Sequence, residues 1–271
     1  GATISSVEFV EDKWGIESKI VLTLNDANNT KVESNVVVRV YENLYYTAES
    51  AEDVLKLMEY GVENIKLGAN VNFAEKLYPT HDVSFDLDGH KFTYPLNGDN
   101  RMYIENGVTV EFKDGDMEFG VEADKKWAQG SIVINTQSTI VLDNVNYLSH
   151  GTALFPRGDT ALVKVVDSVV IGQTYAIATN ASLDPVTKLP IHAGIEVIVD
   201  NSEIKAMSQD KDNAGLLFNV PGTLTVTDSE IVGDTNAVVL ECANFDGVCV
   251  RKSSSRLGLR TDASARYEKM L

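Results

Sequence analysis

Two stretches, Val199-Asp200-Asn201-Ser202-Glu203-Ile204 and Val226-Thr227-Asp228-Ser229-Glu230-Ile231, repeat one short pattern. A β-branched or apolar run is followed by Asp or Asn, then by a small or apolar residue, and then by a further apolar residue. Aligned on the Asp or Asn, the pattern recurs every 24 to 34 residues, at Asp88, Asp114, Asp143, Asp167, Asn201 and Asp228. A loose period of this length with β-type residues predicts stacked repeats that bury a common apolar face.

The strands within these repeats alternate apolar and polar residues, as Ile195, Val197 and Val199 show. Such alternation directs one face inward and the other outward. Asn-Gly and Asp-Gly pairs, which favour tight hairpins, occur up to Gly115 and then not again until Asp246-Gly247. Tight hairpins therefore do not explain the later repeats, which fit the stacked coils of a solenoid. We expect an all-β fold, a right-handed parallel β-helix (solenoid).

The composition limits the possible partners. The chain has 271 residues, is 44% apolar and carries a formal net charge of −17. This charge disfavours nucleic acid and anionic membranes, so we expect no nucleic-acid partner and no membrane insertion. No apolar run reaches the length of a membrane span, and the first residues lack the features of a signal peptide. The oligomeric state stays open.

Three regions are expected along the chain. Residues 1–46 read as a small β unit or the remnant of an immunoglobulin-like domain. Residues 47–235 form the β-helix, with a capping helix over 51–60 that begins after Ser50 and covers the open N-terminal end. Residues 236–271 form a C-terminal segment, in which a helix over 262–270 can act as a lid.

The start of the second region resembles pectin-lyase-like β-helix modules of exported bacterial surface proteins, many of them from gut bacteria. Three segments carry the resemblance, which extends over about residues 47–235: Ser50-Ala51-Glu52-Asp53-Val54, Ile65-Lys66-Leu67-Gly68-Ala69-Asn70-Val71 and Phe85-Asp86-Leu87-Asp88-Gly89-His90. It implies a cell-surface or extracellular location. The absence of Cys before Cys242 suits an exported protein. A disulfide between Cys242 and Cys249 stays open.

Residues 228–271 are similar to the editing-module end of the β subunit of bacterial phenylalanyl-tRNA synthetase. The run from Arg256 to Lys269 is the most specific part. The resemblance implies that Glu241 lines an editing pocket, but the glycine-rich segment and the His expected upstream are absent. A gene fusion, a join between sequences or chance similarity could each account for this segment, and we do not expect editing activity.

Polysaccharide lyases with the pectin-lyase-like fold use acidic calcium ligands and an Arg or Lys base. The candidate carbohydrate- or ligand-binding residues here are Asp143, Asp167, Lys164, Arg157 and His150. Because the two acids recur where each repeat must turn, we expect a structural role for them, with no catalytic residues, no metal site and no cofactor. Ca²⁺ is the alternative cofactor. Residues 210–215 begin like a calcium loop, but Pro221 stands where its last ligand belongs.

We therefore expect a non-catalytic surface or secreted module that serves adhesion, glycan binding or a stalk, with a glycan or host-surface ligand as partner. A polysaccharide lyase or hydrolase is the alternative. A fragment of the phenylalanyl-tRNA synthetase β subunit is a more remote one.

Overall fold

The computed structural model describes residues 3–34, 38–96, 101–121, 130–179, 184–187, 190–207, 213–233, 236–240, 248–253 and 256–257. It divides the chain into two compact units, Gly1–Thr47 (unit 1) and Ala48–Leu271 (unit 2). No helix in these ranges is long and apolar enough to cross a membrane. We describe each unit by itself.

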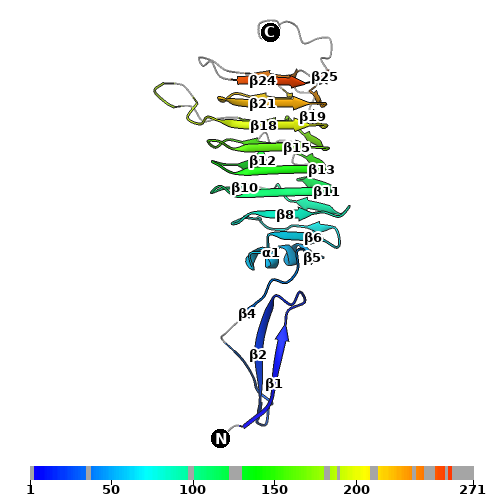
Figure 1. Cartoon of the computed structure of the whole chain (residues 1–271), viewed down its shortest axis with the longest axis vertical. Coiled ribbons are helices and arrows are strands. Elements are labelled where there is room, and N and C mark those ends of the chain that lie inside the picture. The colour runs from blue at the N-terminus through cyan, green and yellow to red at the C-terminus, as the bar shows by residue number, and fades with distance from the viewer. Residues whose placement is uncertain are drawn as a thin grey trace. The chain divides into compact units, whose positions relative to one another are not determined.

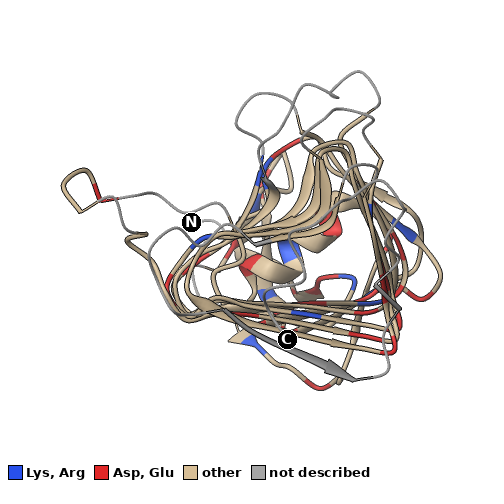
Figure 2. Cartoon of the chain, turned by 90° about the horizontal axis from the view of Figure 1, so that it is seen from above, with Lys and Arg blue, Asp and Glu red and all other residues tan. Residues whose placement is uncertain are grey.

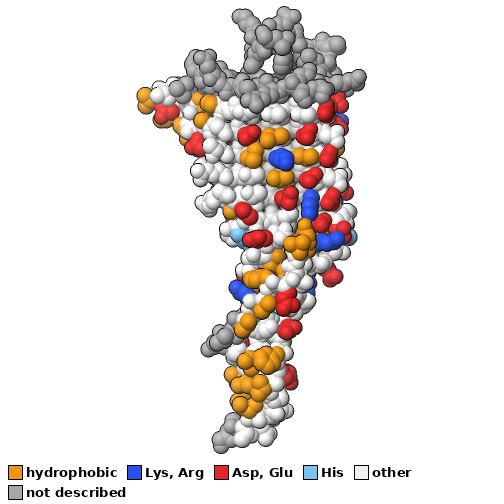
Figure 3. All heavy atoms as spheres, viewed as in Figure 1, with side chains coloured by type: hydrophobic (Ala, Val, Ile, Leu, Met, Phe, Trp, Pro, Cys, Tyr) orange, Lys and Arg blue, Asp and Glu red, His pale blue; other side chains and the backbone are white. Residues whose placement is uncertain are grey.

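Unit 1 is a small antiparallel sheet. Strands β1 (Thr3–Glu11), β3 (Lys31–Glu33) and β4 (Val38–Arg39) each pair with β2 (Glu17–Asn25). The chain reverses between β1 and β2 because Asp12 Oδ1 accepts hydrogen bonds from the backbone N–H groups of Trp14 and Ile16. Ile16 is fully buried, whereas Phe9 is 75% exposed, so the sheet leaves much apolar surface uncovered (Figure 3).

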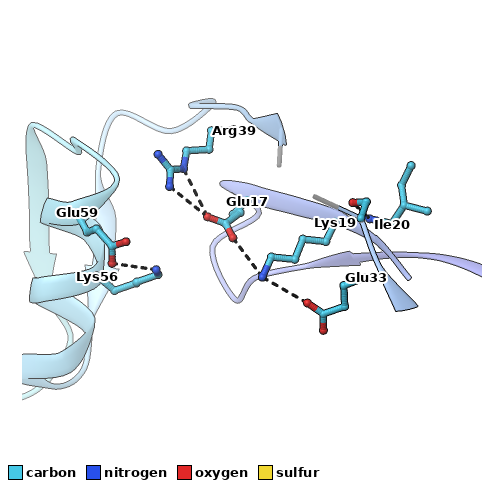
Figure 4. Close-up of polar contacts among 8 residues, drawn as sticks. Glu17, Lys19, Ile20, Glu33, Arg39, Lys56 and Glu59 are labelled. Carbon is cyan, nitrogen blue, oxygen red and sulfur yellow. Dashed lines mark hydrogen bonds and ion pairs between the residues drawn. The ribbon is translucent and has the colours of Figure 1, made fainter. Parts of the chain in front are cut away.

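An ion-pair chain crosses unit 1. Glu17 lies between Arg39 and Lys19, with N–O distances of 3.4 and 3.7 Å, and Lys19 also lies 3.8 Å from Glu33 (Figure 4). Because Lys19, Arg39 and Glu33 are well exposed, solvent screens these pairs and we assign them little stabilising energy.

Unit 2 begins with a capped helix, α1 (Ala51–Glu59). The Ser50 side chain accepts a hydrogen bond from Asp53 N at 3.1 Å, and the Asp53 carboxylate accepts one from Glu49 N at 2.9 Å. The first bond satisfies an N–H group that the helix start leaves unpaired, and the second ties the preceding residue to the first turn. The helix ends before Gly61, whose φ of 81° favours glycine. Its buried face consists of Val54, Leu57 and Met58.

The remainder of unit 2 consists of parallel sheets. The larger sheet has the order β24-β21-β18-β15-β13-β11-β8-β6-β5. Two shorter rows belong to it: β25-β22-β19-β16 joins where β16 pairs with β13, and β7-β9 joins where β9 pairs with β11. Its strands are β5 (Tyr46–Ala48), β6 (Asn64–Leu67), β7 (Val71–Asn72), β8 (Val83–Asp86), β9 (Lys91–Tyr94), β11 (Thr109–Phe119), β13 (Thr139–Ser149), β15 (Leu162–Val166), β16 (Val169–Gly172), β18 (Ile195–Asp200), β19 (Glu203–Ala206), β21 (Gly222–Thr227), β22 (Glu230–Val232), β24 (Val248–Ser253) and β25 (Arg256–Leu257).

The second parallel sheet has the order β10-β12-β14-β17-β20-β23. Its strands are β10 (Met102–Ile104), β12 (Gly130–Ile134), β14 (Thr152–Pro156), β17 (Tyr175–Ala178), β20 (Ala214–Phe218) and β23 (Asn236–Leu240). Figure 1 shows the strands of both sheets stacked layer upon layer, and Figure 2 shows the layers superimposed when viewed from above.

The core lies between the sheets. Strand residues alternate between buried and part-exposed, so that Val110 and Phe112 of β11 are fully buried and Glu111 between them is not. The Phe85 and Phe112 rings of neighbouring strands stack with centroids 5.0 Å apart, and Tyr94 stacks on Phe119 at 4.8 Å. In-register stacking therefore places like side chains above one another.

The repeated Asp or Asn occupies a turn in the left-handed region. The φ values lie between 44° and 59° at Asp88, Asp114, Asn144, Asp167, Asn201 and Asp228. Asp and Asn tolerate this conformation better than most residues. Because β13 pairs Asp143 with Lys113, the residue that corresponds to Asp114 is Asn144. The alignment on Asp143 was thus wrong by one position.

The Ser that follows each of the last three turns links neighbouring layers. Ser168 Oγ accepts a hydrogen bond from Val145 N at 2.9 Å and donates one to Val166 O at 2.6 Å. Ser202 and Ser229 repeat this arrangement. Their hydroxyls accept hydrogen bonds from the backbone N–H of Ser168 and of Ser202, and each donates to the carbonyl two residues before it. All three are buried, so their hydroxyls satisfy backbone groups that water does not reach.

The predicted fold class needs correction. We predicted an all-β, right-handed parallel β-helix closed by a C-terminal helical lid. The described residues instead combine parallel sheets with an α-helix, an α/β composition, and the described part of the C-terminal segment contains β24 and β25. The predicted lid helix over 262–270 lies outside the described residues.

Replacing Ser168 by Ala tests the importance of the turn hydroxyls. The change leaves Val145 N–H buried without its partner, which costs about 1–3 kcal/mol. We expect a lower urea midpoint for unit 2, followed by far-UV circular dichroism. Thr80→Ala removes an exposed hydroxyl and should shift the midpoint much less. Equal shifts for the two variants would contradict this role.

Candidate ligand groove on the strand-joining turns

A polar groove of about 440 Å³ lies on one edge of unit 2. It is lined by three successive turns, at residues 105–106 after β10, 135–137 after β12 and 157–158 after β14, and by His192 ahead of β18. The turns lie next to one another because the strands before them are paired in register, Ile104 with Ile134 and Ile134 with Pro156.

This register places Glu105, Asn135 and Arg157 in one column. Asn135 N donates to Ile104 O at 2.9 Å, and Arg157 N donates to Ile134 O at 3.0 Å, so the strand pairing continues into the turns. Asn135 Nδ2 also donates to Glu105 Oε1 at 2.7 Å. One side chain of the column is acidic, one is neutral and one is basic.

The backbone at Gly158 closes against the neighbouring turn. A Cβ atom at this position would lie 1.9 Å from Thr136 N, a contact that no side chain permits. Gln137, at the end of the turn before, has a φ of 61° and donates its backbone N–H to Asp159 O at 2.8 Å. The groove thus has a backbone floor held by contacts between layers.

His192 borders the groove beside an acid. Its Nδ1 atom is buried, makes no hydrogen bond within the described residues and lies 3.6 Å from Asp159 Oδ1. Asp159 Oδ1 accepts a hydrogen bond from Ala193 N at 2.8 Å, which fixes the segment that carries His192. The buried His192 nitrogen therefore faces Asp159 at ion-pair distance.

The structure separates the five candidate residues predicted from the sequence. Only Arg157 reaches the groove. Asp143 and Lys164 lie on β13 and β15, and Asp167 follows β15 in a turn, where its carboxylate accepts a hydrogen bond from Asn201 Nδ2. Sequence analysis missed Glu105, Asn135 and His192, because only the strand register shows that these turns meet.

The fifth candidate, His150, belongs to a separate cluster. Its Nε2 atom lies 3.3 Å from Glu118 Oε1, and the other oxygen of Glu118 pairs with Lys91 Nζ. The hydrogen bond from Lys91 lowers the pKa of Glu118, His150 acts in the same direction, and partial burial opposes both. This cluster favours the charged form of the carboxylate and links three neighbouring strand layers, with His150 buried.

Within the described ranges, no group of three or more His, Cys, Asp and Glu side chains could hold a metal ion. Residues 210–212 of the calcium-like loop lie outside those ranges, as do Glu241 and Cys242, so the pocket role of Glu241 and the disulfide with Cys249 stay predictions.

Comparison with known proteins finds one matching family model and several relatives with the same name. Residues 138–271 match the family model of the B3/4 domain. The chain is 29% identical over 202 residues to the phenylalanine–tRNA ligase β subunit of Clostridium tetani, covering 68% of this chain and 23% of that protein. It is 34% identical over 103 residues to that of Lactococcus lactis, covering 38% and 11%. No solved structure matches.

Similarity is concentrated in short segments. The β subunit of Streptococcus pyogenes is 54% identical over 41 residues, covering 15% of this chain and 5% of that protein. The chain thus spans less than a quarter of the length of these relatives.

These findings correct most of the functional predictions. The similarity to the synthetase β subunit is supported, whereas the resemblance to pectin-lyase-like modules is not. Four predictions are wrong: a surface or secreted adhesion module, a glycan partner, an extracellular location and the absence of enzyme function. The polysaccharide lyase alternative is not supported either. The exclusion of nucleic acid is also wrong, since the relatives are named as subunits of a ligase for tRNA.

The Glu118 cluster predicts a pH-dependent stability. Because the folded pKa of Glu118 is lowered, its contribution is present above the pKa of an unfolded Glu, about 4.3, and is lost as the pH falls through the folded value. We expect Glu118→Gln to lower the free energy of unfolding at pH 7 by up to about 1 kcal/mol, which is measured as a lower urea midpoint.

This difference should shrink between about pH 5 and pH 3. Glu196→Gln changes an exposed carboxylate on β18 and serves as the control. A Glu118→Gln effect that is constant with pH would contradict the assignment.

Proposed function

We propose that this chain acts in translation as a B3/4-type part of a phenylalanine–tRNA ligase β subunit, with tRNA as its macromolecular partner. The match of residues 138–271 to the B3/4 domain carries this proposal, and the named relatives support it. Because the chain spans less than a quarter of those relatives, we assign it a binding role within a larger ligase.

The charge distribution indicates where tRNA would bind. The net charge of −17 repels phosphate over most of the chain, and Asp and Glu side chains are spread over the visible face of unit 2 (Figure 3). Residues 250–271 are different, with six basic residues against Asp262 and Glu268, a balance of +4. We infer that this basic segment makes the phosphate contacts.

The start of the basic segment is fixed by strand pairing. Arg251 and Lys252 lie on β24, the last strand of the larger sheet, in register with Thr225 and Val226 of β21. The described start of the segment therefore belongs to the last strand of that sheet.

Binding of fluorescently labelled phenylalanine tRNA, measured by anisotropy at several salt concentrations, tests the proposal. Arg256→Gln/Arg260→Gln/Arg266→Gln should weaken binding and reduce the slope of log K against log salt by about 2–3, since each phosphate contact contributes about 0.7–0.9. The control Lys13→Gln/Lys19→Gln/Lys31→Gln removes the same charge from unit 1 and should leave the slope unchanged.

A preference for phenylalanine tRNA over an unrelated tRNA is also expected of a ligase component. Failure of the unmodified chain to bind tRNA, or equal losses in the two triple variants, would overturn the proposal.

A further inference from the structure

We propose that the turn groove binds a short zwitterionic ligand, of the size of a dipeptide, with Glu105 holding its ammonium group and Arg157 its carboxylate. This inference is independent of the role in translation. It rests on the pairing of opposite charges in one groove and on their separation.

The two charged side chains have capacity for a ligand. Within the described residues, the Arg157 guanidinium makes no hydrogen bond or ion pair, which leaves its five N–H donors for a carboxylate. Glu105 accepts a hydrogen bond from Asn135 Nδ2, and a carboxylate has further lone pairs for an ammonium group. Both residues are exposed on the groove.

The strand spacing sets the length of the ligand. Glu105 and Arg157 follow β10 and β14, which are separated by β12, so their backbones lie about 10 Å apart, or two strand spacings. A single amino acid has its charges on neighbouring atoms, whereas each further residue adds about 3.5 Å. A gap of this length, bridged in part by the two long side chains, fits a dipeptide better than a free amino acid.

The two opposite charges of the groove argue against a ligand that carries a charge of only one sign. An anion would meet Glu105 and the strongly negative chain, and a cation would meet Arg157. A zwitterion matches both groups, and each of its ends receives a charge-assisted hydrogen bond that offsets its desolvation.

The middle of the groove suits a peptide group. His192, Thr136 and Gln137 also line the groove. An amide supplies one N–H donor and one carbonyl acceptor. Either of them can bond the Thr136 hydroxyl or the Gln137 side-chain amide, which are exposed on the groove.

Titration calorimetry and ligand-observed NMR with the full chain test this inference. The probes are glycine, glycylglycine and N-acetylglycylglycinamide, which lacks both charges. We expect glycylglycine to bind more tightly than glycine and the blocked peptide not to bind. Glu105→Gln and Arg157→Gln should each weaken the binding of glycylglycine at least tenfold.

Glu105→Gln retains an oxygen that accepts the hydrogen bond from Asn135, so the turn should stay intact, as unchanged circular dichroism and thermal unfolding would show. Glu196→Gln and Lys164→Gln remove one charge of each sign outside the groove and should bind as the unmodified chain does. Absence of glycylglycine binding, equal binding of the blocked peptide, or equal losses in the control variants would overturn the inference.

Discussion

The hydrogen bonds between turns of neighbouring layers are the constraint on which unit 2 depends. Each layer turns at the same place with one residue in the left-handed region, and in the last three layers a buried hydroxyl follows it, as Asp167 and Ser168 show. The hydroxyl satisfies a backbone N–H of the preceding layer, and the strands then pair in register. A turn that failed to bond its neighbour would leave buried backbone groups unpaired and shift the register of the strands beyond it.

The same constraint builds the candidate sites. Side chains far apart in the sequence form columns because their strands are in register: Glu105, Asn135 and Arg157 on the turns, and Lys91, Glu118 and His150 on the outer face. In the second column Lys91 and Glu118 carry opposite charges in adjacent layers, which limits repulsion between stacked layers in a chain of net charge −17. In the first, neutral Asn135 separates the acid from the base, and these form the two ends of the groove.

The sequence predicted local structure better than it predicted class or function. Ser50 and Asp53 indicated the helix start, and most of the repeated Asp and Asn residues are indeed in turns. The groove could not be predicted, since Glu105 and His192 are 87 residues apart and only strand register brings their turns together. The functional predictions failed because the repeated Asp and Asn meet a requirement of turns, which many unrelated proteins share and which therefore says little about function.

The B3/4 match begins at residue 138, but the fold does not divide there. Strand β13, inside the matched segment, pairs along its length with β11, outside it, and β14 pairs likewise with β12. Removing the residues before 138 would expose the edge of both sheets. It would also remove the aromatic contact that Phe119 makes with Tyr147. The groove crosses the same boundary, with Glu105 before it and Arg157 after it. Any activity of the matched segment is therefore carried by a folded body larger than the match, in which both parts share one core.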